Sequence, residues 1–188
     1  MKKILLICSC ILSPFFNYSQ NIELSLQQDA RLLLIGDGKN NSAITLNILT
    51  KVEIPIIKLK NNYIAVYPSI EYADLTGGNF QRYAIGGSYH VNTIYRNIGA
   101  TAFIDIGNIY RKNRSFLSYS MTGELSYTIN NWIQLIGSQQ ITQRKDLKIL
   151  YNSKKEFLIS GFFGVKLSLQ TQKKRFMIKN RGLYLNAI

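Results

Sequence analysis

The chain has 188 residues, of which 46% are hydrophobic and 18% are charged, with 23 Lys and Arg against 10 Asp and Glu. This length suits one domain with a real core, and the composition excludes a disordered, collagen-like or disulfide-stapled chain. No uninterrupted apolar run approaches the roughly 20 residues of a membrane-spanning helix, so a helical membrane protein is excluded as well.

The N-terminus has the pattern of a secretory signal peptide. A basic start is followed by the almost wholly apolar stretch 4–16, and the small residue Ser19 precedes Gln20. We therefore expect residues 1–19 to be removed on export. Both cysteines, Cys8 and Cys10, lie inside this segment, so the mature chain would hold no disulfide and no thiolate metal site. The alternative is a lipoprotein signal that uses Cys10.

The C-terminus is strongly basic. Residues 170–188 contain no acidic residue and carry five basic ones, namely Lys173, Lys174, Arg175, Lys179 and Arg181. Such an excess can indicate nucleic acid, but an exported chain rarely meets it, so no nucleic-acid partner is expected. We favour a periplasmic basic extension beyond the folded domain, and the alternative is that 176–187 pair with the strands of that domain. For the overall excess of positive charge we favour contact with anionic lipid head groups, with solvated loops as the alternative.

Between residues 22 and 169 the dominant period is two, which is the pattern of β-strands. Eight strands are predicted in chain order, at 22–35, 43–54, 63–72, 82–91, 98–110, 116–129, 132–144 and 157–169. The first strand loses its alternation near 28–30, which predicts a β-bulge there. Pro68 weakens the third strand, because proline donates no ladder hydrogen bond.

The connections between these strands differ in length. The mostly longer ones are Gly36–Ser42, Ala73–Gln81, Arg111–Ser115 and Lys145–Glu156, and the mostly shorter ones are Lys58–Asn62, Asn92–Asn97 and Asn130-Asn131. In an up-and-down chain all members of one set lie at the same end. Short turns at one end and longer loops at the other are typical of transmembrane β-barrels. The sequence thus predicts an all-β fold, an eight-stranded antiparallel up-and-down transmembrane β-barrel over residues 20–169.

One face of each predicted strand is apolar and the other is polar but poor in charge, which favours a polar lumen over a solvated outer face. The ionisable residues of the polar face are nearly balanced and predict a lumen ion-pair network of Glu23, Lys51, Glu53, Glu71, Arg82, Asp105, Glu124, Arg144 and Lys166. Glu71 and Arg82 are expected to lie opposite each other and to pair. The alternative for this pair is an exposed cross-strand salt bridge.

Aromatic residues near the strand ends predict two interfacial girdles. One girdle, toward the longer loops, contains Tyr72, Tyr83, Tyr110 and Phe116, and the other, toward the short turns, contains Tyr89, Tyr127 and Trp132. On the lumen side, Tyr67, Phe103 and Phe162 would help to plug a barrel whose interior is only wide enough for side chains. A wide pore is therefore not expected.

Over residues 22–169 the chain resembles the small outer-membrane β-barrel proteins of Gram-negative bacteria, the OmpX and OmpA-barrel class. The most specific match is 164–169, a glycine followed by alternating hydrophobic residues, which is similar to the final-strand signal read by the barrel-assembly machinery. The chain lacks the terminal aromatic residue of that signal, and 182–187 fits nearly as well. The resemblance implies outer-membrane localisation, with the assembly machinery and outer-membrane lipids, including lipopolysaccharide, as partners.

Catalytic chemistry has one candidate, because some barrels of this class modify lipids. His90 is the single histidine, and Ser88 shares its face of the strand. Residues two apart on a strand are about 6–7 Å apart at their backbones, so the hydrogen bond needed to activate a nucleophile is not expected. Neither a metal site nor a cofactor is predicted, because one histidine and scattered acids give no ligand spacing. The run 36–41 is read as turn chemistry rather than a calcium loop.

The expected role is therefore structural or surface-interacting, through the external loops. The surface candidates are four residues of the loop Lys145–Glu156, namely Leu147, Ile149, Leu150 and Tyr151. The alternative for this loop is a plain extension of its hairpin above the membrane. Two alternative functions stay open, a lipid-modifying outer-membrane enzyme and a soluble periplasmic barrel that binds an apolar ligand.

Overall fold

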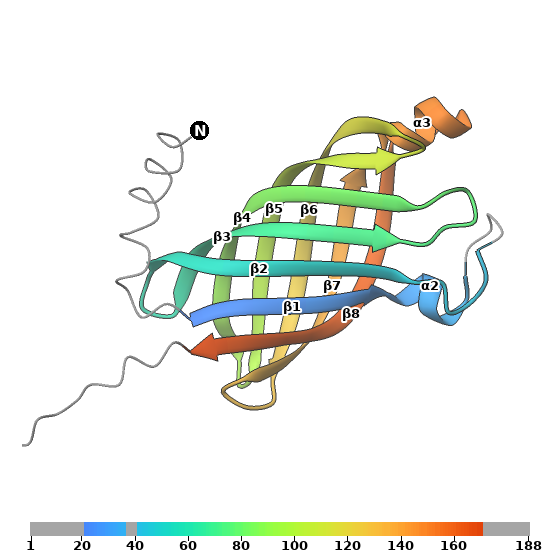
Figure 1. Ribbon diagram of the computed structural model, residues 1–188. Helices are drawn as coiled ribbons and strands as arrows, with labels where there is room; N and C mark the ends of the chain where they lie inside the picture. Colours follow the sequence, from blue (N-terminus) through green and yellow to red (C-terminus); the bar gives the residue numbers. More distant parts are fainter. Residues whose placement is uncertain (1–20, 37–40, 171–188) are drawn as a thin grey trace, which may run out of the picture. The chain divides into compact units, whose positions relative to one another are not determined.

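The computed structural model describes residues 21–36 and 41–170, which form a closed β-barrel with two short helices (Figure 1). The strands are β1 (Asn21–Asp29), β2 (Asn47–Lys58), β3 (Asn62–Ala73), β4 (Phe80–Tyr95), β5 (Ile98–Arg111), β6 (Arg114–Thr128), β7 (Ile133–Gln143) and β8 (Phe157–Gln170). The helices are α2 (Ala30–Leu34) and α3 (Lys145–Tyr151). The predicted signal peptide and all but the first residue of the predicted basic extension lie outside the described residues.

Each strand pairs antiparallel with its neighbour in sequence, and the ring closes between the first and last strands. The β1–β8 ladder runs without a register shift from Asn21 opposite Gln170 to Asp29 opposite Phe162. The predicted fold class is confirmed. Neither helix in the described part of the chain is long and apolar enough to cross a membrane.

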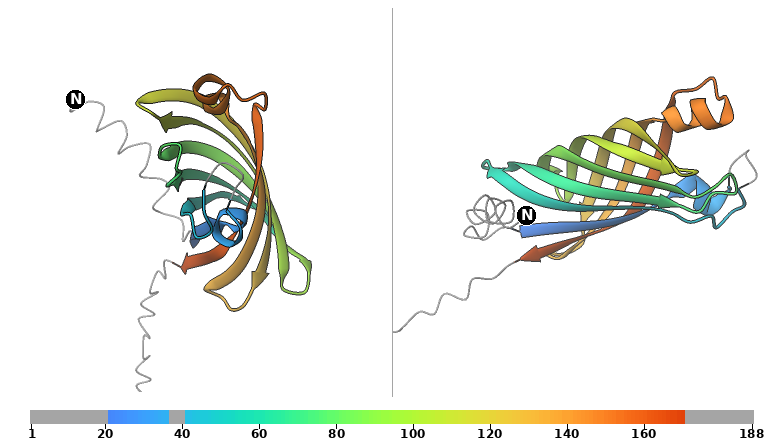
Figure 2. Two further views of the ribbon diagram at one scale, coloured as in Figure 1. Left: turned by 90° about the vertical axis from the view of Figure 1, so that its right-hand side faces the viewer. Right: turned by 45° about the horizontal axis from the view of Figure 1, so that its top comes forward.

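The two ends of the barrel differ. Both helices lie at one end, which we call the loop end (Figures 1 and 2), together with the connections 30–46, 74–79, 112–113 and 144–156. The other end, which we call the turn end, has the connections 59–61, 96–97 and 129–132. The predicted asymmetry is present, with one exception. The stretch Arg111–Ser115, expected among the longer loops, is a two-residue turn in which Lys112 and Asn113 both have positive φ, as tight hairpins require.

The first predicted strand is wrong in its second half. β1 ends at Asp29, whose side chain accepts a hydrogen bond from the backbone N–H of Leu32 at 2.9 Å and so caps α2. The loss of alternation near 28–30 therefore marks a helix start and not a β-bulge. A register shift lies instead in β2, between Pro55 and Ile57.

Two further strands, β2 and β4, have boundaries that differ from the predicted ones. The strand predicted at 43–54 runs four residues later, as β2, because α2 and the residues after it occupy 30–46. β4 continues to Tyr95, so most of the connection predicted at 92–97 belongs to the strand, and only residues 96–97 form the turn.

The interior of the barrel is polar and its outer face is apolar. Among the described residues, buried polar or charged side chains outnumber buried hydrophobic ones. The outward positions of β6 show the opposite face, with Tyr119, Met121 and Leu125 all exposed while their neighbours Ser118, Ser120 and Glu124 are buried. A soluble barrel has the reverse arrangement.

Candidate functional site

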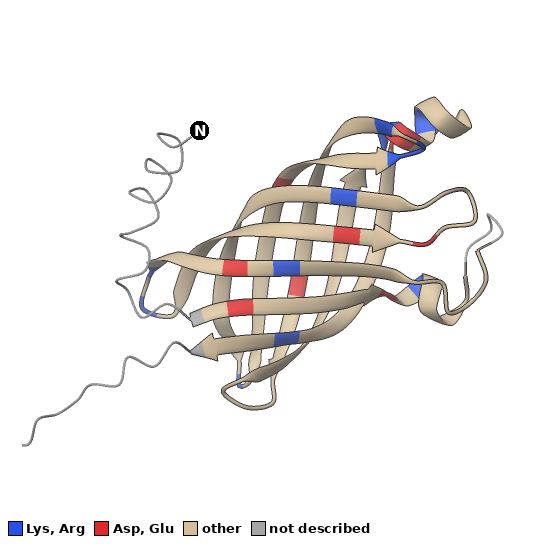
Figure 3. Ribbon diagram, in the orientation of Figure 1, with Lys and Arg blue, Asp and Glu red and all other residues tan. Residues whose placement is uncertain are grey.

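Charged residues occur on the strands and at the loop end of the barrel (Figure 3), and their buried ion pairs of Lys or Arg with Asp or Glu form three groups. The lysine cluster consists of Glu23, Lys51, Glu53, Glu124 and Lys166. The arginine pair consists of Arg82 and Asp105. The mouth clamp, at the loop end, consists of Arg111, Arg144 and Asp146.

Lys166 is the centre of the lysine cluster. Its Nζ lies 2.7 Å from Glu124 Oε1, 3.0 Å from Glu53 Oε1 and 3.7 Å from Glu23 Oε2. The second ammonium group, that of Lys51, lies 3.5 Å from the other oxygen of Glu124. These residues come from β1, β2, β6 and β8, so the cluster joins strands that face each other across the lumen.

Neutral side chains hold the lysine cluster in place. Tyr63 donates a 2.8 Å hydrogen bond to Glu23, and Gln27 donates a 3.0 Å hydrogen bond to Glu124. The Gln27 amide oxygen accepts in turn from Ser138 at 2.6 Å. The ammonium group of Lys51 lies 3.8 Å from the centre of the Phe103 ring. Charge and packing are thus satisfied together in a narrow interior.

The arginine pair lies nearer the loop end. Arg82 forms an ion pair with Asp105 and donates a 2.7 Å hydrogen bond to Ser118. Tyr67 and Ser120 donate to the same carboxylate at 2.9 and 2.8 Å. Tyr67 and Phe103 are buried and meet edge to face, and Phe162 is buried as well.

The predicted pair of Glu71 with Arg82 is not formed. Register does place Glu71 opposite Arg82, but the guanidinium group turns to Asp105 on the strand at its other side. Asp105 is the better partner because two hydroxyl groups already orient its carboxylate. Glu71 is left buried at the loop end of the lumen.

His90 lies in a cage of polar and aromatic groups. Its Nε2 lies 2.7 Å from Glu53 Oε2 and 2.9 Å from Ser88 Oγ, its Nδ1 lies 3.0 Å from Thr101 Oγ1, and its ring stacks on Tyr63 at 3.9 Å. The expectation that Ser88 and His90 lie too far apart is wrong, because both side chains lean into the same lumen. The geometry is still not that of a nucleophile triad. There the acid and the nucleophile contact different ring nitrogens, whereas here both contact Nε2.

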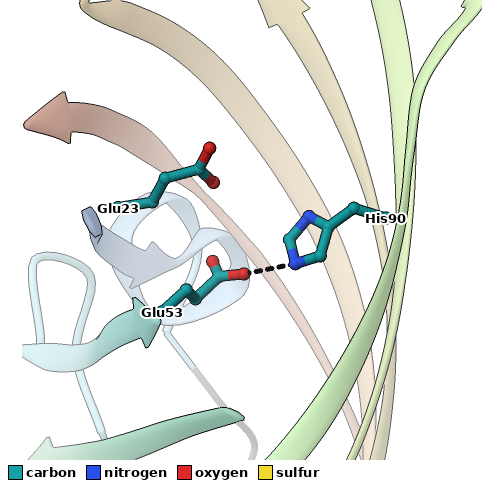
Figure 4. Close-up of side chains that lie close together, drawn as sticks. All are labelled: Glu23, Glu53 and His90. Carbon is teal, nitrogen blue, oxygen red and sulfur yellow. Dashed lines mark ion pairs between the residues drawn. The ribbon is translucent and has the colours of Figure 1, made fainter. Parts of the chain in front are cut away.

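Glu23, Glu53 and His90 also meet as a group with metal-ligand chemistry (Figure 4). Each offers one ligand atom, and these atoms lie within 4.8 Å of one another. The ammonium group of Lys166 already contacts both carboxylates and supplies the positive charge between them. The sequence did not predict this convergence, because the three residues come from three different strands.

The mouth clamp fixes α3 to the end of the barrel. Asp146 is fully buried and accepts two 2.8 Å hydrogen bonds from Arg144, one at each carboxylate oxygen, and Arg111 donates to Oδ2 as well at 3.4 Å. Burial alone would raise the pKa of Asp146, but the hydrogen bonds and charge of Arg144, with those of Arg111, hold this pKa below its ordinary value. Arg144 was expected in the lumen network and belongs to this clamp instead.

The predicted surface residues of α3 do not all face outward. Leu147 is buried and lines the cavity at the loop end, and Leu150 is half-buried. Ile149 and Tyr151 are exposed. The Tyr151 ring covers the guanidinium group of Arg111 at 4.6 Å, and its hydroxyl group donates to the carbonyl of Gly77.

The outward aromatic residues lie near both ends of the barrel wall. Tyr83 and Tyr110 meet edge to face, with ring centres 5.8 Å apart, near the loop end. Tyr72 is half-buried, and it and Tyr110 lie opposite Gln81 on either side of β4. Near the turn end the exposed aromatic residues of the prediction are Tyr89, Tyr127 and Trp132. Phe116 is the exception, because it points inward and packs against a small core of Ala73, Phe80 and Ile109.

A cavity of about 680 Å³ lies between the mouth clamp and the lumen. It is lined by strand residues and by both helices, including Asp29, Asn47, Glu71, Phe80, Arg111, Arg144, Leu147 and Tyr151. The sequence reasoning missed Arg111 and Asp146. Arg111 shares the inward parity of Asp105 on β5, which is the signal that could have found it, whereas no local pattern marks Asp146.

Comparison with known proteins places the fold. No known family model matches the chain, and no curated protein is detectably similar to it in sequence. The outer-membrane protein Ail of Yersinia pestis, in a phospholipid bilayer nanodisc, superposes with a TM-score of 0.52 at 12% identity, covering 80% of this chain and 99% of Ail. Neisserial surface protein A gives 0.49 at 10% identity, covering 81% and 97%, and the crystal structure of Ail gives 0.43 at 11%, covering 79% and 96%. The chain thus has the fold of a small eight-stranded outer-membrane β-barrel protein.

Proposed function

We propose that this protein is an outer-membrane barrel with a filled, non-conducting lumen, which acts in the cell envelope structurally or by surface interaction at its loop end. The observation that carries the proposal is the inverted burial, by which we mean that the barrel buries polar side chains in its interior and exposes apolar ones on its outer wall. The outer wall is apolar, and within the strands the charged residues apart from Lys58 and Arg114, at strand ends, are buried or half-buried. Only a hydrocarbon surrounding makes such a wall favourable.

The packed lumen supports a role other than solute passage. Lys166, Arg82 and Tyr67 rank among the largest fully buried side chains of the described residues, and all three point into the lumen. Eight strands enclose an interior that side chains fill. Passage of a solute would require breaking the lysine cluster or the arginine pair.

The loop end is the end that we assign to the cell exterior. β1 begins and β8 ends at the turn end, and short turns are periplasmic in barrels of this kind. Ile149 and Tyr151 on α3 would then face the medium and could meet a partner. Outer-membrane lipids, including lipopolysaccharide, would surround the wall, and the barrel-assembly machinery would read 164–169 in β8, the strand that closes the ring.

The enzyme alternative rests on Ser88, His90 and Glu53. Their contacts favour a buried structural histidine, because both partners compete for Nε2 and the ring is covered by Tyr63. The deciding experiment is a His90→Ala variant expressed in cells whose lipid A is then analysed by mass spectrometry. We expect the same lipid A profile as with the wild type, and a lost modification would assign the enzyme.

The soluble-carrier alternative requires an apolar interior, and the interior is polar. Cell fractionation decides between the outer-membrane barrel and the soluble carrier. We expect recovery in the outer membrane, with a mobility on gels that changes on boiling. Recovery in the soluble periplasm without this shift would exclude the proposal.

The filled lumen has a separate test. Liposomes that contain the purified protein should swell in small sugars no faster than protein-free liposomes, whereas a porin serves as the positive control. Rapid swelling would contradict a non-conducting lumen while leaving the membrane location intact.

A further inference from the structure

The cavity at the loop end carries an inference of its own, which does not depend on the surface role proposed above. With about 680 Å³ it has the size of small-molecule sites. Its lining includes Arg31, Gly77 and Tyr151, which are exposed, so the cavity communicates with the solvent at the barrel mouth.

Glu71 is a buried carboxylate that lines this cavity without a partner. It is only 5% exposed, and no hydrogen bond or ion pair reaches it from the residues that the structure describes. The two arginines whose charges act on Glu71 both have other partners, since Arg82 pairs with Asp105 and Arg144 with Asp146. An unpaired buried carboxylate is costly unless it is protonated or a cation lies beside it.

A second unpartnered acceptor lies beside it. Asn47 pairs in register with Ala73, two residues from Glu71, and its buried Oδ1 has no hydrogen-bond partner. Asp29, which also lines the cavity, uses Oδ1 to cap α2. The adjacent strands β1, β2 and β3 therefore present acceptors and negative charge to one wall of the cavity.

Of the remaining lining, Arg31, which is exposed, Asn41, Ser153 and Ser160 are polar, and the other residues are apolar or held by ion pairs. Arg111 and Arg144 are held by Asp146 and lie against the rings of Tyr151 and Phe80. The apolar part of the lining consists of Leu32, Ala73, Leu75, Phe80, Leu147 and Leu158. A ligand that fits has a hydrogen-bond donor with positive charge at one end and an apolar body at the other.

We propose that the mouth cavity binds a small organic primary amine, whose ammonium group contacts Glu71 and Asn47 Oδ1 and whose apolar body lies against Leu147 and Phe80. An ammonium group has three donors and no acceptor, which matches the two unpartnered acceptors, the Glu71 carboxylate and Asn47 Oδ1. A charge-assisted contact to a carboxylate gives the ammonium group its advantage over a neutral donor.

The test uses the folded protein in detergent micelles with leucine methyl groups labelled for NMR. The probe is 2-phenylethylamine, and its matched analogues are neutral 2-phenylethanol and anionic 3-phenylpropionate. Leu32, Leu147 and Leu158 report on the cavity, whereas Leu125 and Leu135 on the outer wall report on partition of the probe into the micelle. We expect saturable shifts at the cavity leucines with the amine and no saturation with the two analogues.

Variants then separate the site from general charge effects. Glu71→Gln should weaken binding of the amine about tenfold or more, and Asn47→Ala should weaken it several-fold. Asp74→Asn removes the same charge from an exposed loop position at the end of β3 and should leave binding unchanged. The heat-dependent gel shift of each variant verifies that its barrel has folded.

The inference is overturned if 2-phenylethanol binds as tightly as the amine, or if Glu71→Gln and Asn47→Ala both fold and bind normally. Equal shifts at the outer-wall leucines would also overturn it, because they would mean partition into the micelle. None of these results bears on the membrane location, which fractionation tests separately.

Discussion

At the scale of single residues, the lumen is organised by buried charges whose partners come from other strands. Lys166 makes the largest number of these ion pairs among the described residues, because its one ammonium group contacts three carboxylates. A buried charge that loses its partner is strongly destabilising, whereas an exposed ion pair contributes little.

Replacement of Lys166 by methionine tests this role. Methionine keeps most of the volume but leaves Glu53 and Glu124 short of positive charge, so we expect a loss of about 3–5 kcal/mol in the free energy of unfolding. Urea unfolding in lipid vesicles, followed by the fluorescence of Trp132, measures it. The matched control is Lys148→Met, whose side chain is 63% exposed and faces Glu156 at 3.9 Å, and which should change stability by no more than about 0.5 kcal/mol.

Asp146 makes the attachment of α3 dependent on pH. Its pKa is lowered in the folded protein, so its contribution is complete above the ordinary value of 3.8 and is lost as the pH falls through the lower folded pKa. We expect the protection factors of the α3 amides, which correct for the intrinsic pH dependence of exchange, to be constant from neutral pH down to about 4 and to fall below it. Asp146→Asn should give the low protection already at neutral pH, and an unchanged protection factor in this variant would contradict the clamp.

At the scale of the elements, the strands were predictable because their signal is local. Alternation, as in 116–129, depends on nothing beyond the two faces of a pleated strand. The helices were not predictable in this way. α2 and α3 have five and seven residues, too few to be stable alone, and they form because Asp29 caps one and Asp146 anchors the other.

A glycine on the inner face of β4 shows how tightly neighbouring strands approach. A Cβ at Gly86 would lie 2.6 Å from the Cβ of Asp105 and 2.9 Å from Cζ of Tyr67. The nearest atom to such a Cβ is the backbone carbonyl oxygen of Ile104. Gly86→Ala should therefore lower stability by about 1–3 kcal/mol, because the backbone of β5 must shift and Tyr67 or Asp105 must move away from its partners. The midpoint of urea unfolding checks it.

The control for this substitution is Gly123→Ala on β6, where a Cβ meets nothing within 4 Å. It adds a methyl group to the outer wall and should not lower the unfolding midpoint. Equal effects of the two substitutions would mean that glycine matters here for backbone freedom and not for space.

At the scale of the whole molecule, the apolar outer wall and polar interior support the proposal that hydrocarbon surrounds the barrel. Met121, in the middle of β6, is 62% exposed, and an arginine there would face the hydrocarbon. We expect Met121→Arg to lower the stability of the membrane-inserted barrel by about 2–4 kcal/mol. Ile149→Arg, at a position that is 58% exposed on α3, should have little effect. Folding yield in lipid vesicles distinguishes the two, and equal yields would contradict a lipid-facing wall.

The sequence by itself determined the number of strands, their up-and-down order, the polarity of their two faces and the difference between the two ends. These features follow from local alternation and from turn residues, which act over a few positions. Only the tertiary structure decided which inward charges meet. Arg82 pairs with Asp105 and not with the opposite Glu71, and Lys166 pairs with three acids. Glu71 lines a cavity instead. Closure of the ring brings together residues that are distant in the chain, and no periodicity records which of them will touch.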